Sequence, residues 1–508
     1  MPDILLATLN AKFIHAAFGL RYLMANLGEL RERAAIAEFD INQRPLDIAE
    51  GILEQKPTIL GLGVYIWNVD QTTEVVSILR KVAPEITIVL GGPEVSHEVQ
   101  DQAIIELADH VVAGEADLAF ADLCRDLLSD KLPDEKIIRA SLPDPAQIAS
   151  PYALYSDKDI ANRIIYVEAS RGCPFTCEFC LSSLDVPVRQ FPVEAFLEDM
   201  QGLLDRGVRQ FKFVDRTFNL NLKISSQILQ FFLDRMSEDL FVHFEMIPDR
   251  LPQGLRDIIR QYPPGQLQFE VGIQTFNTEV GKNISRRQNY EKLADNFQFL
   301  RNETGVHIHA DLIVGLPGET LESFAEGFDR LVDLQPQEIQ VGILKRLKGT
   351  PIIRHDAEFQ MVYDSAPPYE ILQNRDITFR DMQRMRLFQR YWDLIGNSGN
   401  FTRSTPLIWR KSGRPFEGFL NLSDWLFAQT GSRHGIALLR LVKLLFQYLT
   451  EQAGIEEREA AESLLMDYQA GGRPETPRFL GEHLPKEFKG VKKKILSKTA
   501  TRQARHLG

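Results

Sequence analysis

The chain has 508 residues, of which 44% are hydrophobic and 25% are charged, and its formal net charge is −12. This length predicts two or three domains, and the acidic balance argues against a nucleic-acid-binding protein. No apolar run approaches the roughly 18 residues of a membrane span, and the start, MPDILLATLNAKF, lacks the basic region of a signal peptide. Four cysteines, three of them clustered, fit a reducing compartment, so we expect a cytoplasmic protein without membrane contacts.

Residues 1–140 predict a doubly wound parallel sheet of the Rossmann-like α/β class. Continuous apolar runs alternate with amphipathic segments, which is typical of parallel strands joined by crossover helices. The candidate strands are DILLATL, AAIAEFDI, TILGLGVYI, ITIVLGG and HVVAGEA. Ligands of such sheets bind at the carboxyl ends of the strands. The fingerprint GxGxxG does not follow the first strand, which argues against a nicotinamide or flavin cofactor.

Residues 141–161 are rich in proline and aspartate and predict a linker. The alternation resumes in residues 162–350, where the candidate strands are IIYVEAS, VRQFKFVD, LFVHFEMI, QLQFEVGIQ, VHIHADLIVG and EIQVGIL. Six such units predict a partial (β/α)6 barrel or a second open sheet. In either case the chemistry is expected on the loops that follow the strands.

Residues 351–508 predict a mainly α-helical region. RDMQRMRLFQRYWDLI and IALLRLVKLLFQYLTEQ place apolar residues three and four positions apart, as on one face of a helix. The tail KEFKGVKKKILSKTATRQARH is basic. Charged chain ends are commonly solvated, so we expect a frayed terminus there rather than a nucleic-acid contact.

Three cysteines, Cys173, Cys177 and Cys180, form the pattern CxxxCxxC directly after the first strand of the second series. A structural zinc site needs four ligands, and no histidine occurs between Val111 and Val242 to complete one. Soft thiolates suit an iron–sulfur cube, which four cysteines usually bind. With three, one iron stays open for a reactant, as in catalytic metal sites. The fourth cysteine, Cys124, lies in an amphipathic segment and is expected to be a small buried residue.

RGCPFTCEFC resembles the signature of the radical S-adenosylmethionine (radical SAM) superfamily, and the resemblance runs from about residue 162 to residue 350. It implies that Cys173, Cys177 and Cys180 bind a 4Fe–4S cluster whose open iron chelates SAM. It also implies that an electron from the cluster cleaves SAM and releases a 5′-deoxyadenosyl radical. No catalytic side chain is assigned, because the radical itself removes the substrate hydrogen.

The resemblance also assigns SAM-binding roles to residues at the later strand ends. Polar strand ends after the cysteine motif are VDRTFN, FEM, GIQT and GLPGET, followed by the pair of arginines in SRR. An arginine suits the carboxylate of SAM, and glycines let the backbone approach the adenosine. The implied SAM-binding residues are Asp215, Arg216, Glu245, Gln274, Arg286, Gly315 and Gly318.

The first region, with strand ends GVYIWN, GGPEVS and GEAD, resembles the cobalamin (B12)-binding branch of the superfamily, including a subgroup with a helical C-terminal region. The resemblance implies cobalamin binding by Gly63, Val64, Gly91, Gly92, Gly114 and Glu115. Cobalamin proteins that ligate cobalt through histidine carry DxHxxG, whereas this chain has NAKFIHAAFG. We therefore expect a structural role for His15 and a mode of cobalamin binding without histidine.

The resemblance implies a cobalamin-dependent methyltransferase acting on an unactivated carbon of a substrate that the sequence does not name. A small-molecule substrate and an electron donor such as flavodoxin or ferredoxin are the expected partners. One alternative is a cobalamin-dependent radical cyclase or rearrangement enzyme without net methylation. A tRNA methylthiotransferase fits poorly, because the first region holds only Cys124. A non-enzymatic, metal-stabilised scaffold is the alternative from another class, and the open iron position argues against it.

Overall fold

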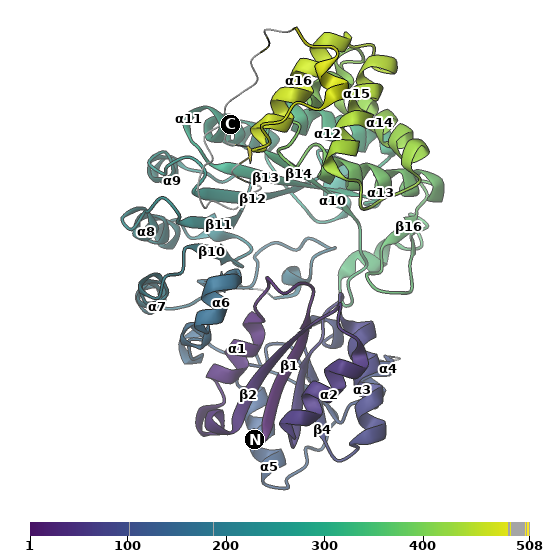
Figure 1. Ribbon diagram of the computed structural model, residues 1–508. Helices are drawn as coiled ribbons and strands as arrows, with labels where there is room; N and C mark the ends of the chain where they lie inside the picture. The colour runs from purple at the N-terminus through teal and green to yellow at the C-terminus, as the bar shows by residue number, and fades with distance from the viewer. Residues whose placement is uncertain (101, 186, 486–487, 489–502, 504, 507–508) are drawn as a thin grey trace. The chain divides into compact units, whose positions relative to one another are not determined.

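The computed structural model describes residues 1–508 except 101, 186, 486–487, 489–502, 504 and 507–508 (Figure 1). The chain divides into two compact units. The first comprises Met1–Arg216, Lys345–Ile353 and Asp364–Glu370, and the second comprises Thr217–Leu344, Arg354–Tyr363 and Ile371–Gly508. Within the described residues, no helix combines the length and apolarity needed to cross a membrane.

The first unit opens with a six-stranded, all-parallel sheet in the order β2-β1-β3-β4-β5-β6, which confirms the expected doubly wound class. Its strands are β1 (Ile4–Asn10), β2 (Ala34–Asp40), β3 (Ile59–Gly63), β4 (Thr87–Gly91), β5 (His110–Ala113) and β6 (Ile137–Arg139). All seven residues of β1 are buried, as expected for a strand covered on both faces. The pattern did not predict β6, because this strand has three partly exposed residues and no apolar run.

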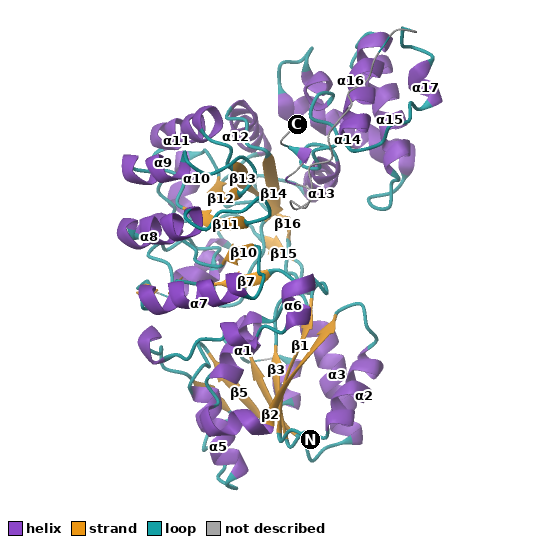
Figure 2. Ribbon diagram, turned by 60° about the vertical axis from the view of Figure 1, so that its left-hand side comes forward, coloured by secondary structure: helices purple, strands orange, loops and turns teal. Residues whose placement is uncertain are grey.

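Helices cover both faces of this sheet: α1 and α5 lie on one side, and α2 and α3 on the other (Figure 2). The helices are α1 (Phe18–Ala25), α2 (Pro45–Gln55), α3 (Val69–Val82), α4 (Ala103–Leu107) and α5 (Ala119–Leu128). Each face has its own apolar core, one including Ile48 and Val76 and the other including Leu20 and Phe120. Cys124 belongs to the second core, and burial raises the pKa of its thiol to about 12. Such a thiol stays protonated and is a poor metal ligand.

The rest of the first unit contains the cysteine loop. Its elements are α6 (Asp157–Asn162), β7 (Ile165–Val167), β8 (Ser170–Arg171), β9 (Arg189–Gln190), α7 (Val193–Asp205) and β10 (Gln210–Phe213). β7 pairs with β10 in parallel, and β8 pairs with β9 in antiparallel, so that residues 172–188 form the loop between β8 and β9. The segment expected as a linker is ordered: Tyr152 and Tyr155 are buried, and Ser156 and Asp159 form a capping box at the start of α6.

The second unit continues the α/β series. Its first elements are α8 (Leu222–Leu233), β11 (Phe241–Met246), α9 (Gln253–Ile259), β12 (Leu267–Gln274), α10 (Thr278–Asn283), α11 (Tyr290–Glu303), β13 (His307–Val314), α12 (Leu321–Asp333) and β14 (Glu338–Ile343). β11 to β14 pair in parallel in sequence order. Figure 2 shows α8, α9 and α11 on one side of these strands. Phe269, Val271 and Ile273 of β12 are buried, whereas Glu270 and Gln274 are half-buried on the opposite face.

The remainder of the second unit is mainly helical, as expected. Its elements are β15 (Val362–Tyr363), β16 (Ile371–Gln373), α13 (Phe379–Leu394), α14 (Pro415–Thr430), α15 (Leu438–Glu451), α16 (Glu457–Ala470) and α17 (Arg478–Gly481). Phe388 and Trp392 of α13 stack on each other and pack in tilted or edge-to-face contacts against Phe416 and Phe419 of α14, forming an aromatic core. Most of the basic tail predicted at the C-terminus lies outside the described residues.

Short 3₁₀ helices connect several of these elements. They are η1 (Gly28–Arg33), η2 (Pro93–Val95), η3 (Pro145–Gln147), η4 (Tyr152–Leu154), η5 (Leu181–Leu184), η6 (Phe218–Leu220), η7 (Pro351–His355) and η8 (Thr405–Trp409).

Candidate functional site

The cysteine loop begins with a turn that only glycine fits. Gly172 has φ of 88°, and a Cβ on it would lie 2.7 Å from the carbonyl oxygen of Asp185. The next residue, Cys173, donates its backbone N–H to that same oxygen at 3.0 Å. Cys173 and Cys177 are buried, and Cys180 is half-buried at the start of η5. The end of the loop thus holds its beginning in place.

The donor chemistry of the three thiols suits an iron–sulfur cluster. No disulfide joins any of these three cysteines. Within the described residues, no three side chains of His, Cys, Asp or Glu converge as the ligands of one ion would. In a cube, each thiolate binds a different iron, so the sulfur atoms need not surround one point. Soft donors in one loop suit that arrangement.

A cavity of about 220 Å³ opens at the carboxyl ends of β3, β4 and β5 in the first unit. Its lining residues are Gly19, Leu20, Tyr22, Leu23, Gly61, Leu62, Gly63, Tyr65, Val89, Leu90, Gly91, Gly92, Val112, Gly114, Ala116, Asp117, Phe120 and Arg171. We call this cavity the crevice. It lies where ligands of doubly wound sheets bind, and its wall is largely backbone and apolar side chain, which suits a flat organic group.

Four of the six residues that the sequence assigned to cobalamin line the crevice: Gly63, Gly91, Gly92 and Gly114. The other two, Val64 and Glu115, are adjacent to it but outside its lining. Val64 is fully buried in the apolar core, and its backbone N–H donates to the carbonyl of Gly91 at 2.8 Å. Glu115 is engaged in ion pairs.

The two glycines of the turn after β4 have different structural roles. Gly92 has φ of 105°, and a Cβ there would lie 2.5 Å from the backbone oxygen of Val64, so the fold itself excludes a side chain. A Cβ on Gly91 would have one neighbour, the carbonyl oxygen of Val112, at an ordinary 3.6 Å. The absence of a side chain at Gly91 therefore keeps the crevice open without being needed for the turn.

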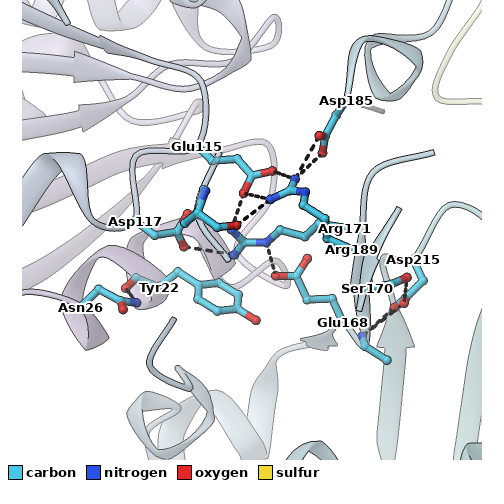
Figure 3. Close-up of polar contacts among 12 residues, drawn as sticks. Tyr22, Asn26, Glu115, Asp117, Glu168, Ser170, Arg171, Asp185, Arg189 and Asp215 are labelled. Atoms are coloured by element: carbon cyan, nitrogen blue, oxygen red, sulfur yellow. Dashed lines mark hydrogen bonds and ion pairs between the residues drawn. The ribbon is translucent and has the colours of Figure 1, made fainter. Parts of the chain in front are cut away.

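Arg171, at the end of β8, lines the crevice and directly precedes the cysteine loop (Figure 3). Its guanidinium makes a bidentate pair with Asp117, with Nη1–Oδ2 at 2.8 Å and Nη2–Oδ1 at 3.1 Å. It also contacts Glu115 at 3.0 Å and Glu168 at 2.9 Å, and it lies 4.5 Å from the ring centroid of Tyr22. The side chain is only 12% exposed, so these pairs are largely shielded from water.

Arg189 of β9 makes a second link in the same network. It binds Glu115 and also Asp185, with Nη2–Oδ2 at 2.9 Å. Burial raises the pKa of Glu115, but the hydrogen bonds and charges of Arg189 and Arg171 outweigh burial and lower it overall. Burial likewise raises the pKa of Glu168, and there it dominates over Arg171. The two arginines thus pair with four carboxylates, and each arginine binds more than one of them.

Asp215, after β10, braces the start of the cysteine loop (Figure 3). Its carboxylate accepts hydrogen bonds from Ser170 Oγ at 2.6 Å and from the backbone N–H of Ala169 at 3.0 Å. Burial raises its pKa to about 7, against the lowering effect of the Ser170 hydrogen bond. The sequence assigned Asp215 to SAM, but its carboxylate oxygens are engaged in these two contacts. Its neighbour Arg216 ends the first unit.

In the second unit, the residues predicted to bind SAM lie at or after strand ends. Glu245 of β11 is in register with Glu270 of β12. Gln274 ends β12 with φ of 73°, a conformation that side-chain-bearing residues rarely adopt. Arg286 donates through Nη2 to the carbonyl oxygen of Gly272. Polar side chains thus gather at the carboxyl end of this sheet, as expected for a binding edge.

Gly315 and Gly318, predicted to approach adenosine, have φ of 92° and 83°. Side chains of the chain itself fill the space beside them. A Cβ on Gly315 would lie 2.7 Å from Ile371 Cγ2, and one on Gly318 would lie 2.9 Å from Asn283 Nδ2. The fold therefore explains the glycine at each of these two positions, whether or not a ligand binds there.

Sequence reasoning missed several crevice residues, among them Tyr22, Tyr65, Asp117 and Arg171. Asp117 lies two positions after the predicted Glu115, so the strand-end rule could have found it. Arg171 was quoted only as part of the cysteine motif. His15, which we expected to be structural, is bonded through Nδ1 to the hydroxyl of Tyr166 at 2.7 Å and is not part of the crevice lining.

Three known protein families match successive parts of the chain. The B12 binding domain family matches residues 4–124, and the radical SAM superfamily matches residues 167–331. A family described as a protein of unknown function (DUF4080) matches residues 357–506. The chain thus contains a B12-binding domain followed by a radical SAM domain.

The chain is also similar to individual proteins whose names or titles mention cobalamin and radical SAM chemistry. The chain is 25% identical to the cobalamin-dependent radical SAM methyltransferase TokK of Streptomyces tokunonensis, over 65% of the chain and 53% of TokK, so it spans about half the length of that relative. The structure of TsrM from Kitasatospora setae, solved with cobalamin and a 4Fe–4S cluster, matches 72% of the chain and 78% of TsrM, at 16% identity and a TM-score of 0.58. OxsB with aqua-cobalamin matches 95% of the chain and 80% of OxsB, at 13% identity and a TM-score of 0.60. These two structural matches show the fold alone.

Proposed function

We propose that this chain, in which a B12-binding domain precedes a radical SAM domain, is a radical enzyme that transfers a methyl group to an unactivated carbon of a small-molecule substrate. The observation that carries the proposal is the shared position of Arg171, which lines the crevice and leads into the cysteine loop. Such an arrangement places the crevice, which has room for part of a cobalamin molecule, and the cluster loop in one unit. TokK, whose name includes cobalamin-dependent radical SAM methyltransferase, supports the same assignment.

In this proposal, Cys173, Cys177 and Cys180 bind a 4Fe–4S cluster through their thiolates, and the crevice binds cobalamin. When bound, these groups supply the electron that cleaves SAM and a carrier for the methyl group. Gly172 and the carbonyl of Asp185 fix the entry to the loop. The backbone of Gly91 and Gly92 forms the crevice wall, so that a flat ligand can lie against it without meeting side chains.

SAM binding is proposed for residues that carry polar side chains at or after the ends of strands. Arg216, Glu245, Gln274 and Arg286 are the side chains with suitable chemistry, since guanidinium groups pair with a carboxylate and carboxylates pair with an ammonium group. Asp215 acts differently: it holds Ser170 and Ala169, and thereby the strand that leads into the loop. A soluble reductant such as flavodoxin or ferredoxin is the proposed electron donor, and the cytoplasm is the proposed location.

The test is the identification of nucleoside products by mass spectrometry. Anaerobically reconstituted protein is given SAM, a strong reductant and methylcobalamin, with and without a metabolite extract. We expect 5′-deoxyadenosine together with S-adenosylhomocysteine, because one SAM supplies the radical and another the methyl group. 5′-Deoxyadenosine without S-adenosylhomocysteine would contradict methyl transfer and favour a cyclase or rearrangement enzyme.

The matched controls are two cysteine substitutions. Cys173→Ala leaves two thiolates in the loop, and we expect SAM cleavage to fall below detection, because two ligands do not retain a cube. Cys124→Ala removes a thiol buried in α5, and we expect cleavage to persist. SAM cleavage by the Cys173 variant at the native rate would overturn the ligand assignment.

A further inference from the structure

We propose that Arg171 and Asp117 couple the two cofactor sites, so that cobalamin in the crevice stabilises the cluster loop and a formed cluster raises the affinity for cobalamin. This inference rests on the proposed function, since it needs both cofactors to bind. Arg171 acts as a positioning residue: it contacts the crevice on one side and is joined to Cys173 through Gly172 on the other. The geometry provides two routes between the sites.

The first route is direct. Asp117 and Tyr22 line the crevice together with Arg171, and the guanidinium pairs with Asp117 while lying over the Tyr22 ring. The Nε of the same guanidinium binds Glu168, which lies between β7 and β8, just before the loop. A group bound in the crevice would therefore touch residues that fix the position of Arg171, one residue before the glycine that opens the loop.

The second route passes through the partner strand. β8 and β9 are paired in the register Arg171↔Arg189. Arg189 links Glu115 of the first domain to Asp185, and the backbone carbonyl of Asp185 accepts the N–H of Cys173. The first route thus joins Asp117 to Arg171, two positions before Cys173, and the second joins Glu115 to Cys173 through Arg189 and Asp185. Figure 3 shows the contacts of the two arginines with these carboxylates.

The sign of the coupling follows from electrostatics. A ligand that fills the crevice removes water from the exposed side of the Arg171–Asp117 pair, and ion pairs strengthen as the local dielectric falls. The conformation in which Arg171 holds the loop is then favoured. Coupling between two binding sites is reciprocal, so a cluster that fixes Cys173 must raise cobalamin affinity by the same factor. Such couplings are typically about 5- to 150-fold, and we expect about tenfold here.

The test compares the dissociation constant of aquocobalamin, measured by anaerobic equilibrium dialysis, in cluster-free and cluster-reconstituted full-length protein. For the native chain, we expect the dissociation constant to be about tenfold lower in the reconstituted form than in the cluster-free form, a ratio of about ten. For Asp117→Asn, which keeps the shape but weakens the ion pair of the direct route, we expect the ratio to fall from about ten toward one, because only the route through Arg189 remains. We expect a similar fall in the ratio for Arg171→Lys, because lysine cannot make the bidentate pair with Asp117. Asp122→Asn is the matched control, because Asp122 pairs with Arg125 on the exposed side of α5.

The ratio of the two dissociation constants distinguishes coupling between the sites from the loss of a direct contact with cobalamin. A variant that only loses a contact with cobalamin shifts both dissociation constants equally and keeps the ratio. A ratio of one in the native chain would overturn the coupling, and a native ratio retained in Asp117→Asn would overturn the assigned route. If the native chain binds no cobalamin at all, the proposed function fails together with the inference.

The rate of iron release to a chelator gives an independent readout. We expect aquocobalamin to slow this release severalfold in the native chain and in Asp122→Asn, and to slow it clearly less in Asp117→Asn. Equal release rates with and without cobalamin in the native chain would overturn the proposal.

Discussion

At the scale of single residues, the two glycines of the turn after β4 have different roles. One is required by the fold, and the other keeps space for the proposed ligand. Gly92 is required by the turn, because a Cβ would meet the backbone of Val64. Gly91 has space beside it and lines the crevice, so its lack of a side chain serves the cavity. Asp215, which the sequence predicted to bind SAM, also has a role in the fold, because it braces the start of the cysteine loop through Ser170.

Gly91→Val should therefore weaken cobalamin binding while leaving the fold intact. The new methyl groups would occupy part of a cavity of only about 220 Å³, and we expect at least a tenfold rise in the dissociation constant of aquocobalamin, measured by equilibrium dialysis. Gly202→Val is the matched control, because Gly202 in α7 has open space around it. Unchanged affinity in the Gly91 variant would place cobalamin elsewhere.

Asp215→Asn should change how stability depends on pH. The pKa of Asp215 is about 7 in the folded chain against an ordinary 3.8, owing to burial. Its contribution to stability is thus full below the unfolded-state pKa and is lost as the pH rises through about 7. Each pKa unit corresponds to about 1.4 kcal/mol, so the native chain should lose up to about 4 kcal/mol relative to the variant between pH 4 and pH 8.

Urea unfolding of the native chain and the Asp215 variant across this pH range measures that difference. Asp205→Asn, at an exposed position at the end of α7, provides the control and should show no comparable trend. A difference between native chain and Asp215 variant that does not change with pH would contradict the raised pKa.

At the scale of elements, a segment distant in sequence supports the crevice. The turn after β4 continues into η2, where Glu94 is buried. Its carboxylate accepts a hydrogen bond from the hydroxyl of Tyr369 at 2.6 Å and pairs with Lys348 at 2.8 Å. Glu98 binds Arg346 and the N–H of Gly349. Residues 345–353 and 364–370 thus pack against the turn that forms the crevice wall.

Lys348→Met should destabilise the first unit, because it leaves the carboxylate of Glu94 buried with only a hydroxyl partner. Breaking a buried pair in this way costs about 3–5 kcal/mol, which urea unfolding measures, and hydrogen exchange should become faster at residues 91–96. Lys131→Met is the control: Lys131 is 72% exposed in its pair with Asp126, and exposed pairs contribute about 0–1 kcal/mol. Equal effects of the two substitutions would show that Glu94 does not depend on Lys348.

At the scale of the whole molecule, the two cofactor sites proposed here belong to one compact unit, although the sequence divides them between two domains. The first unit contains the whole B12-binding domain, the cysteine loop and the first two strands of the radical SAM series. The charged network around Arg171 lies within this unit. A radical enzyme that uses both cofactors gains from this arrangement, because the distance between their sites is set by packing within one body.

The sequence by itself determined the fold class of each region and pointed to the three cysteines proposed as cluster ligands. Continuous apolar runs predict parallel strands because both faces of such strands are buried, and CxxxCxxC is local, so spacing alone identifies the motif. The strand-end rule also found Gly63, Gly91, Gly92 and Gly114. Only the tertiary structure decided that Arg171 and Asp117 meet at the crevice, that Asp215 braces the loop, and that Lys348 reaches Glu94. These contacts join residues 45 to 254 positions apart, and no local pattern encodes which distant charge will neutralise a buried one.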